Sequence, residues 1–127
     1  MKTNFLLSVL ALIFAGCNSD PIIAEDYRDA FVGTYIGTRT NSSWSLNSPS
    51  SSYDVADTIE VLAVSDSSVT LDVTEIIIRS DGEFYEHGSS GASSYFSARF
   101  FNGDSLITEM NGGGLGGGYH STFKGKK

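Results

Sequence analysis

Histidine and acidic side chains are the groups of this sequence whose chemistry would suit a metal site or acid–base catalysis. The two histidines are His87 and His120, and the acidic residues nearest the first are Asp81, Glu83 and Glu86. A zinc site or a catalytic pair would need both imidazoles to converge with carboxylates. The spacing matches no metal-binding motif, and adjacent strand residues such as Glu86 and His87 point to opposite faces. We therefore expect solvated histidines, no catalytic residue, no metal and no cofactor.

A glycine-rich run invites comparison with phosphate-binding loops, because residues 112–118 read Gly-Gly-Gly-Leu-Gly-Gly-Gly. Such a loop needs a Lys and then a Ser or Thr after its last glycine, between a strand and a helix. Here Tyr119 and His120 follow the last glycine. The run therefore predicts a flexible hairpin loop over 111–118.

Aromatic side chains are the candidates for binding a sugar or a protein partner, because their rings supply large amphipathic contacts. The candidates are Trp44, Tyr53, Tyr85, Tyr95 and Tyr119. Trp44 is the strongest of them, since it lies in a Ser-rich segment, 40–52, that we predict to be a long loop with few apolar neighbours. The alternative is that Trp44 covers one end of the barrel as a plug.

The only cysteine, Cys17, follows a short cationic segment and an apolar run from Phe5 to Ala15. A membrane-spanning helix needs about 20 apolar residues, so this shorter run is typical of a signal peptide. Its end, Ile-Phe-Ala-Gly-Cys, resembles a lipobox, in which small residues precede a cysteine that is acylated. We predict a lipoprotein signal peptide over 1–16, a lipidated tether over 17–24 and a mature domain over 25–127.

The lipobox resemblance implies that acyl chains on Cys17, palmitate among them, attach the chain to a membrane. The expected location is the cell envelope, as an outer membrane lipoprotein, and exposure at the cell surface is a further hypothesis. A formal net charge of −7 repels phosphate and argues against nucleic acid as a partner. The expected partners are the membrane and a protein or glycan.

Abundant Ser, Thr, Gly and aromatic residues predict an all-β domain. Alternating apolar residues and turn signals predict one short helix over 24–30 and a single antiparallel meander of about seven strands. The strands are expected at 31–39, 58–64, 69–79, 83–87, 95–101, 105–110 and 119–124. The meander should curl into a barrel or split into a sandwich, and its consecutive hairpins favour the barrel.

Local sequence features predict where the strands bend and turn. Gly37, with a second glycine on the same face of its strand, predicts a bend or a close approach of two backbones. Asp-Gly at 81–82 and Asn-Gly at 102–103 predict tight hairpins. Within 69–79 the apolar residues change face, which predicts either a bulge near Thr74 and Glu75 or burial of residues 76–78 on both faces.

Two resemblances extend over parts of the chain. Phe-Val-Gly-Thr-Tyr at 31–35 resembles the start of lipocalin-like domains. Together with the lipobox, Gly-Asp-Ser-Leu at 103–106, the glycine run and the Phe-Lys-Gly-Lys-Lys end, it also resembles small β-rich Bacteroidota lipoproteins. The second resemblance implies an anchored lipoprotein with a non-enzymatic binding or structural role. The first implies the alternative, a lipocalin-like carrier of a small apolar ligand.

Overall fold

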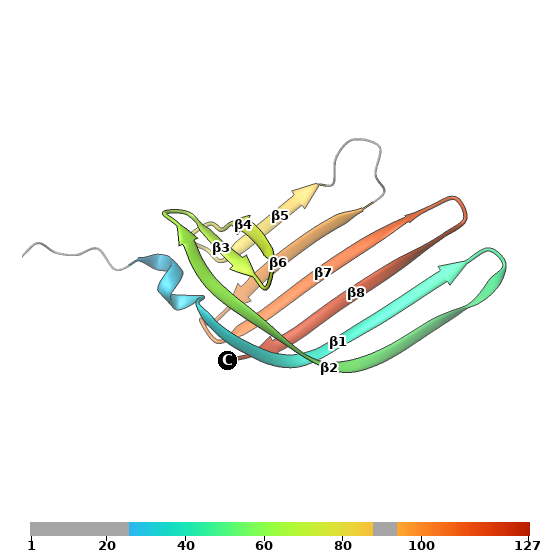
Figure 1. The fold of residues 1–127 in the computed structure, drawn as a ribbon, viewed down its shortest axis with the longest axis horizontal. Coiled ribbons are helices and arrows are strands. Elements are labelled where there is room, and N and C mark those ends of the chain that lie inside the picture. Colours follow the sequence, from blue (N-terminus) through green and yellow to red (C-terminus); the bar gives the residue numbers. More distant parts are fainter. Residues whose placement is uncertain (1–25, 88–93) are drawn as a thin grey trace, which may run out of the picture.

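Antiparallel strands make up nearly all of the computed structural model, which describes residues 26–87 and 94–127 (Figure 1). One 3-10 helix, η2 (Tyr27–Ala30), precedes eight strands. The strands are β1 (Gly33–Ser45), β2 (Ser48–Ser65), β3 (Ser68–Leu71), β4 (Thr74–Ile77), β5 (Glu83–His87), β6 (Tyr95–Phe101), β7 (Ser105–Gly114) and β8 (Gly117–Lys126). The predicted signal peptide, the predicted tether and the first two residues of the predicted helix, 24–25, lie outside the described residues.

The strands form one sheet in the order β4-β3-β2-β1-β8-β7-β6-β5, so consecutive strands pair except that β1 pairs with β8 and β4 does not pair with β5. The predicted hairpin at 102–103 is confirmed, and Asn102 and Gly103 both have a positive φ (53° and 72°). The predicted turn at 81–82 is present, but it links the two edges of the sheet and forms no hairpin. The sheet curls into a nearly closed barrel, which confirms the all-β antiparallel class.

The barrel interior is filled by side chains from one face of the sheet, which we call the inner face. Tyr35 and Phe123 are fully buried there, and the Tyr35 hydroxyl donates to the Phe31 carbonyl at 2.8 Å. Burial raises the pKa of Tyr35 to about 12, and the charge of Asp104 adds to the effect. The buried apolar set is Phe31, Tyr35, Ile59, Val61, Val69, Leu71, Ile76, Ile78, Ala98, Phe100, Leu106 and Phe123.

The predicted strand 69–79 is wrong in one respect, because it is two short strands, β3 and β4, joined by a turn. Asp72 takes a left-handed conformation at this turn, with φ 54°. Its backbone N–H donates to the Glu60 carbonyl and its carboxylate accepts from the Glu60 N–H, each at 2.9 Å. A reversal of the chain therefore explains why the apolar residues change face, and neither a bulge nor two-sided burial is needed.

Two segments that we predicted to be loops, 40–52 and 111–118, are mostly strand instead. β1 runs to Ser45, β2 begins at Ser48, and β7 and β8 meet at a tight turn between Gly114 and Gly117. Every described residue of β1 from 40 to 43 pairs with both β2 and β8, so neighbours on both sides hold a Ser-rich backbone extended. These strands continue past the barrel and end in two adjacent hairpins at the right of Figure 1.

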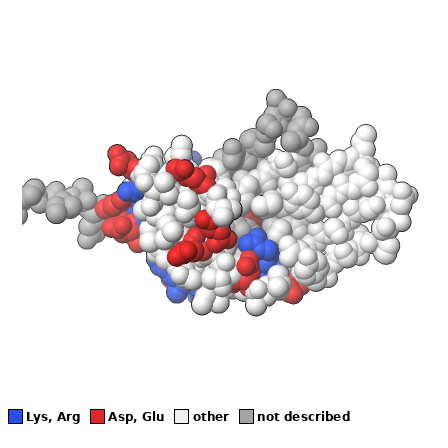
Figure 2. Space-filling view, viewed as in Figure 1, with Lys and Arg blue, Asp and Glu red and all other residues white. Residues whose placement is uncertain are grey.

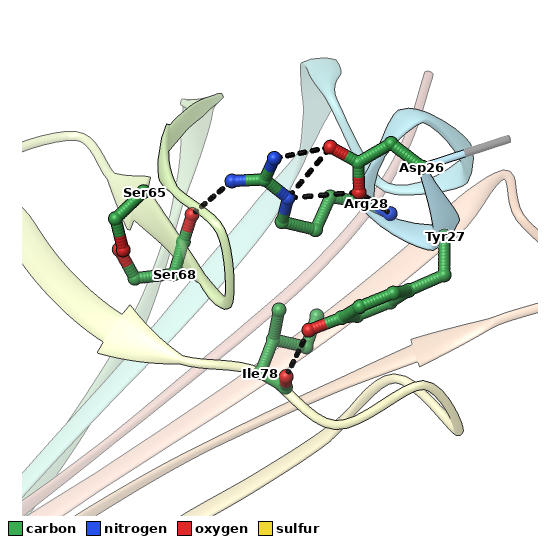
Figure 3. Close-up of polar contacts among 6 residues, drawn as sticks. All are labelled: Asp26, Tyr27, Arg28, Ser65, Ser68 and Ile78. Carbon is green, nitrogen blue, oxygen red and sulfur yellow. Dashed lines mark hydrogen bonds and ion pairs between the residues drawn. The ribbon is translucent and has the colours of Figure 1, made fainter. Parts of the chain in front are cut away.

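The short helix η2 lies at the opposite end of the barrel (Figure 1), and Figure 3 shows the contacts that hold it there. The Tyr27 hydroxyl donates to the Ile78 carbonyl at 2.9 Å. Arg28 pairs with Asp26, which caps the helix, and also donates to the Ser68 carbonyl at 3.5 Å. The hydrogen bond from Arg28 lowers the pKa of Asp26. The predicted helix over 24–30 therefore differs in the structure: within the described residues it is only a four-residue 3-10 turn, which ties the chain to β3 and to the residue after β4.

Candidate binding surface on the uncharged extension

Charge divides the molecule into two ends. We call residues 40–53 and 110–122 the extension. These two ranges comprise the end of β1, the start of β2, the end of β7, the start of β8 and the turns between them. Neither range contains Asp, Glu, Lys or Arg. On the face drawn in Figure 2, the acidic and basic side chains gather over the barrel, and the far end carries neither. Within the described residues, the Asp, Glu, Lys and Arg side chains therefore belong to the barrel end, whereas the extension carries other polar and apolar groups.

The inner face continues from the barrel core onto the extension without a break in register. Tyr53 lies opposite Asn41, Asn41 opposite Ser121, and Ser121 opposite Met110 on four neighbouring strands. Directly opposed residues point to the same face, so this row lies on the inner face. Tyr119 lies one step further along that face, opposite Ser43. Tyr53 is 63% exposed and Tyr119 is 47% exposed, so the aromatic rings that line this face meet solvent.

Hydrogen bonds between neutral side chains fix the surface between the two tyrosines. Ser121 Oγ donates to Asn41 Oδ1 at 2.8 Å, and the hydroxyls of Ser43 and Ser51 are 2.9 Å apart. Sequence reasoning missed these residues, because they lie in segments interpreted as loops. The sequence does show a run of Ser and Asn residues between two aromatic residues. Only the register of the strands shows that these side chains lie on one surface.

An ion pair marks the border between the barrel core and the extension. Arg39 Nε donates to Asp57 Oδ2 at 2.5 Å. The guanidinium also lies over the Phe123 ring, 5.5 Å from its centroid. The charged group thereby covers the last fully buried ring of the inner face, and the exposed aromatic surface begins beyond it.

Trp44 lies on the outer face, near the end of β1, and is 48% exposed. It pairs with Gly118, and its indole lies against the position that a Gly118 side chain would occupy. Trp44 is therefore neither part of a long loop nor a plug over the barrel. On the inner face the ring of Tyr119 covers Gly112 in the same manner, so aromatic rings shield glycine backbone on both faces of the extension.

The remaining aromatic candidates do not join Tyr53 and Tyr119. Tyr95 lies opposite Asn111, which by alternation places it on the outer face of β6. Tyr85 is described only as part of β5, where its backbone lies opposite Ser97. Of the candidates whose side chains are described, Tyr53 and Tyr119 share the inner face, whereas Trp44 and Tyr95 lie on the outer face.

The histidine and acidic side chains considered for a metal or catalytic site have separate local contacts. His120 binds Asn111 through Nδ1 and Thr122 through Nε2, on the outer face of the extension. The hydrogen bond from Arg79 lowers the pKa of Asp81. His87 is described only as the last residue of β5. Within residues 26–87 and 94–127, no group of three or more His, Cys, Asp or Glu side chains is placed to hold a metal.

Comparisons with known proteins found no relative: no family model, no curated protein and no solved structure matches this chain. The part of the chain that the structure describes contains no helix long and apolar enough to cross a bilayer. Cys17, the predicted lipidation site, lies outside the described residues.

Proposed function

We propose that this chain is a lipoprotein, anchored through lipid on Cys17, whose β domain has a non-enzymatic binding role at the cell envelope. The lipobox-like sequence before Cys17 supports the anchor. The binding role rests on one observation, which is that exposed aromatic rings line the inner face of an extension without charged side chains. Helix η2 lies at the end of the molecule opposite the hairpins, so an anchor attached before it would leave the extension free to meet a partner (Figure 1).

The surface chemistry favours an uncharged partner. Tyrosine rings offer flat apolar faces, and the Asn and Ser side chains between them supply donors and acceptors without charge. That combination fits the alternating C–H and hydroxyl surfaces of a neutral glycan, or an uncharged polar patch on a protein. A nucleic acid is disfavoured, because the extension offers no cation to its phosphates.

The second candidate, a carrier of a small apolar ligand inside the barrel, has less support. Such a carrier needs an internal cavity. The rings of Phe31 and Phe100 lie 4.9 Å apart and those of Tyr35 and Phe100 lie 5.7 Å apart, inside the space that a ligand would need. This packing favours binding on the surface of the sheet over binding within it.

Lipidation is tested by metabolic labelling of the full chain with radioactive palmitate in a bacterial host. We expect label in the chain, because a thiol at a lipobox is the acceptor of the acyl groups. The Cys17→Ser variant should carry no label and should leave the membrane fraction. Label that persists in Cys17→Ser, or an unlabelled parent chain, would contradict the anchor.

The binding surface is tested in the Cys17→Ser background, so that lipid does not hold the chain on the envelope. Replacing Tyr53 and Tyr119 with alanine should lower retention on an insoluble envelope fraction about tenfold or more, because truncating a buried aromatic anchor at an interface costs more than about 1 kcal/mol. Retention is measured by co-sedimentation over a range of chain concentrations.

Leu62→Ala is the matched control for this experiment. Leu62 has the same exposed fraction as Tyr119, 47%, but lies on β2 within the barrel end, next to the buried Val61. We expect it to leave retention unchanged. Equal losses in Leu62→Ala and in the tyrosine variant would show that the inner face of the extension is not the binding surface.

A further inference from the structure

Three exposed apolar side chains gather at the end of the extension, and the binding surface described above uses none of them. Trp44 is the second-last residue of β1, Leu46 lies in the β1–β2 turn and Leu115 in the β7–β8 turn. Their exposed fractions are 48%, 73% and 98%. We call these three residues the apolar tip.

The two hairpins that carry the apolar tip form a single end. Ser45 lies opposite Gly117 in the pairing of β1 with β8, and the Leu46 N–H donates to the Gly116 carbonyl at 3.2 Å. Strand pairing therefore continues to the last residues before each turn and satisfies much of the backbone there. Within the described structure, a side chain added at Gly114 or Gly116 would meet nothing within 4 Å, and Leu115 between them is almost fully exposed.

The chemistry of the apolar tip fits a lipid surface better than a protein. A stable protein interface buries about 800 Å² on each partner, more than three side chains on two narrow turns can supply. A lipid surface needs no matching shape. A charged residue near the hydrocarbon would be costly, and the extension has none over 40–53 and 110–122. Trp44 lies about two residues behind Leu46, the depth at which an indole meets lipid headgroups when leucines enter the acyl region.

We propose that the apolar tip inserts into the interface of an uncharged lipid surface, with Leu46 and Leu115 entering the acyl region and Trp44 at headgroup depth. This contact goes beyond the proposed function and does not depend on lipid at Cys17. In a chain that is also lipidated, it would give the domain a second point of attachment, at the end opposite helix η2 (Figure 1).

Trp44 is the only tryptophan of the chain, so its fluorescence reports on the apolar tip alone. The full chain is mixed with phosphatidylcholine vesicles, and then with the same vesicles made from lipid brominated in the acyl chains. We expect the emission to move to shorter wavelength and the brominated lipid to quench it. The signal is followed over a range of vesicle concentrations, which gives an apparent partition coefficient. Leu115→Ser and Leu46→Ser should each lower this partition coefficient about tenfold or more.

Val73→Ser is the control, because Val73 is 97% exposed in the β3–β4 turn of the barrel end, as free of contacts as Leu115. It should leave the Trp44 signal unchanged. A chain that floats with the vesicles while Trp44 is neither shifted nor quenched would overturn the insertion and leave the lipid anchor intact. A Trp44 shift that needs anionic lipid, or that follows chain concentration without vesicles, would also overturn it, the latter in favour of a second copy as the occupant.

Discussion

Replacing Gly37 with alanine is expected to lower the free energy of unfolding by about 3 kcal/mol or more, the upper end of the cost of overpacking. A Cβ at this position would overlap the carbonyl oxygen of Lys124 and lie 2.5 Å from the Cα of Gly125. Both atoms belong to the backbone of β8, so no side-chain movement relieves the clash. Urea unfolding followed by circular dichroism measures the loss.

The position of Gly37 in the sheet makes this contact costly. Gly37 lies opposite Gly125, in the pairing of β1 with β8 that joins the strands β4-β3-β2-β1 to the strands β8-β7-β6-β5. Separation at this point would divide the barrel core into two halves that share no other described strand pairing. The predicted close approach of two backbones at Gly37 is thereby confirmed.

Gly116→Ala is the matched control, since a Cβ there meets nothing within 4 Å and Gly116 lies in the β7–β8 turn. Its effect on the free energy of unfolding should stay within about 0.5 kcal/mol. A similar loss in both variants would mean that glycine flexibility, and not the approach of β1 to β8, accounts for the effect at Gly37.

The barrel could be predicted from the sequence, because its strands bury one face. Alternation between apolar and polar residues follows from that burial, and it located β6 at the bounds that the structure has, 95–101. The Asn-Gly turn at 102–103 followed from its need for positive φ. Both signals are local, which is why a single sequence reveals them.

The extension could not be predicted in this way, because both of its faces meet solvent over much of its length. Without a buried face there is no alternation, and Ser and Gly have little preference for strands. Residues 40–45 are held extended by pairing with β2 and with β8, and β8 lies far from β1 in the sequence. Trp44 over Gly118 and Tyr119 over Gly112 are the side-chain signatures of that pairing, and they become visible only once the register is known.

The same absence of burial supports the roles that we propose for the extension. Natural edge strands usually carry charges that prevent unwanted pairing. Residues 48–53 of β2 form an exposed edge without Lys, Arg, Asp or Glu. Neutral polar residues and aromatic rings on such a long projection contribute little to the barrel core. The contact that we propose, with a partner or a lipid surface, would explain why the extension has this composition.

Replacing Phe123 with alanine is expected to destabilise the domain by about 3 to 5 kcal/mol, the usual cost of truncating a buried phenylalanine. Phe123 is fully buried in β8, a central strand, where its ring covers Gly125 and supports the Arg39 guanidinium. Its removal would leave a cavity and withdraw the cation–π contact of Arg39. Urea unfolding of the variant and the parent chain, under identical conditions, gives the difference.

Tyr119→Ala separates this structural role from the proposed binding role. Tyr119 lies four residues earlier in β8 on the same face, but it is 47% exposed and its ring lies over Gly112. We expect a loss below about 1 kcal/mol, since little buried surface is removed. If Tyr119→Ala destabilised the domain as much as Phe123→Ala, the extension would belong to the folding core. A small loss, combined with weaker envelope retention when Tyr53 is also replaced, would show that one face of β8 changes from packing to binding at the Arg39–Asp57 pair.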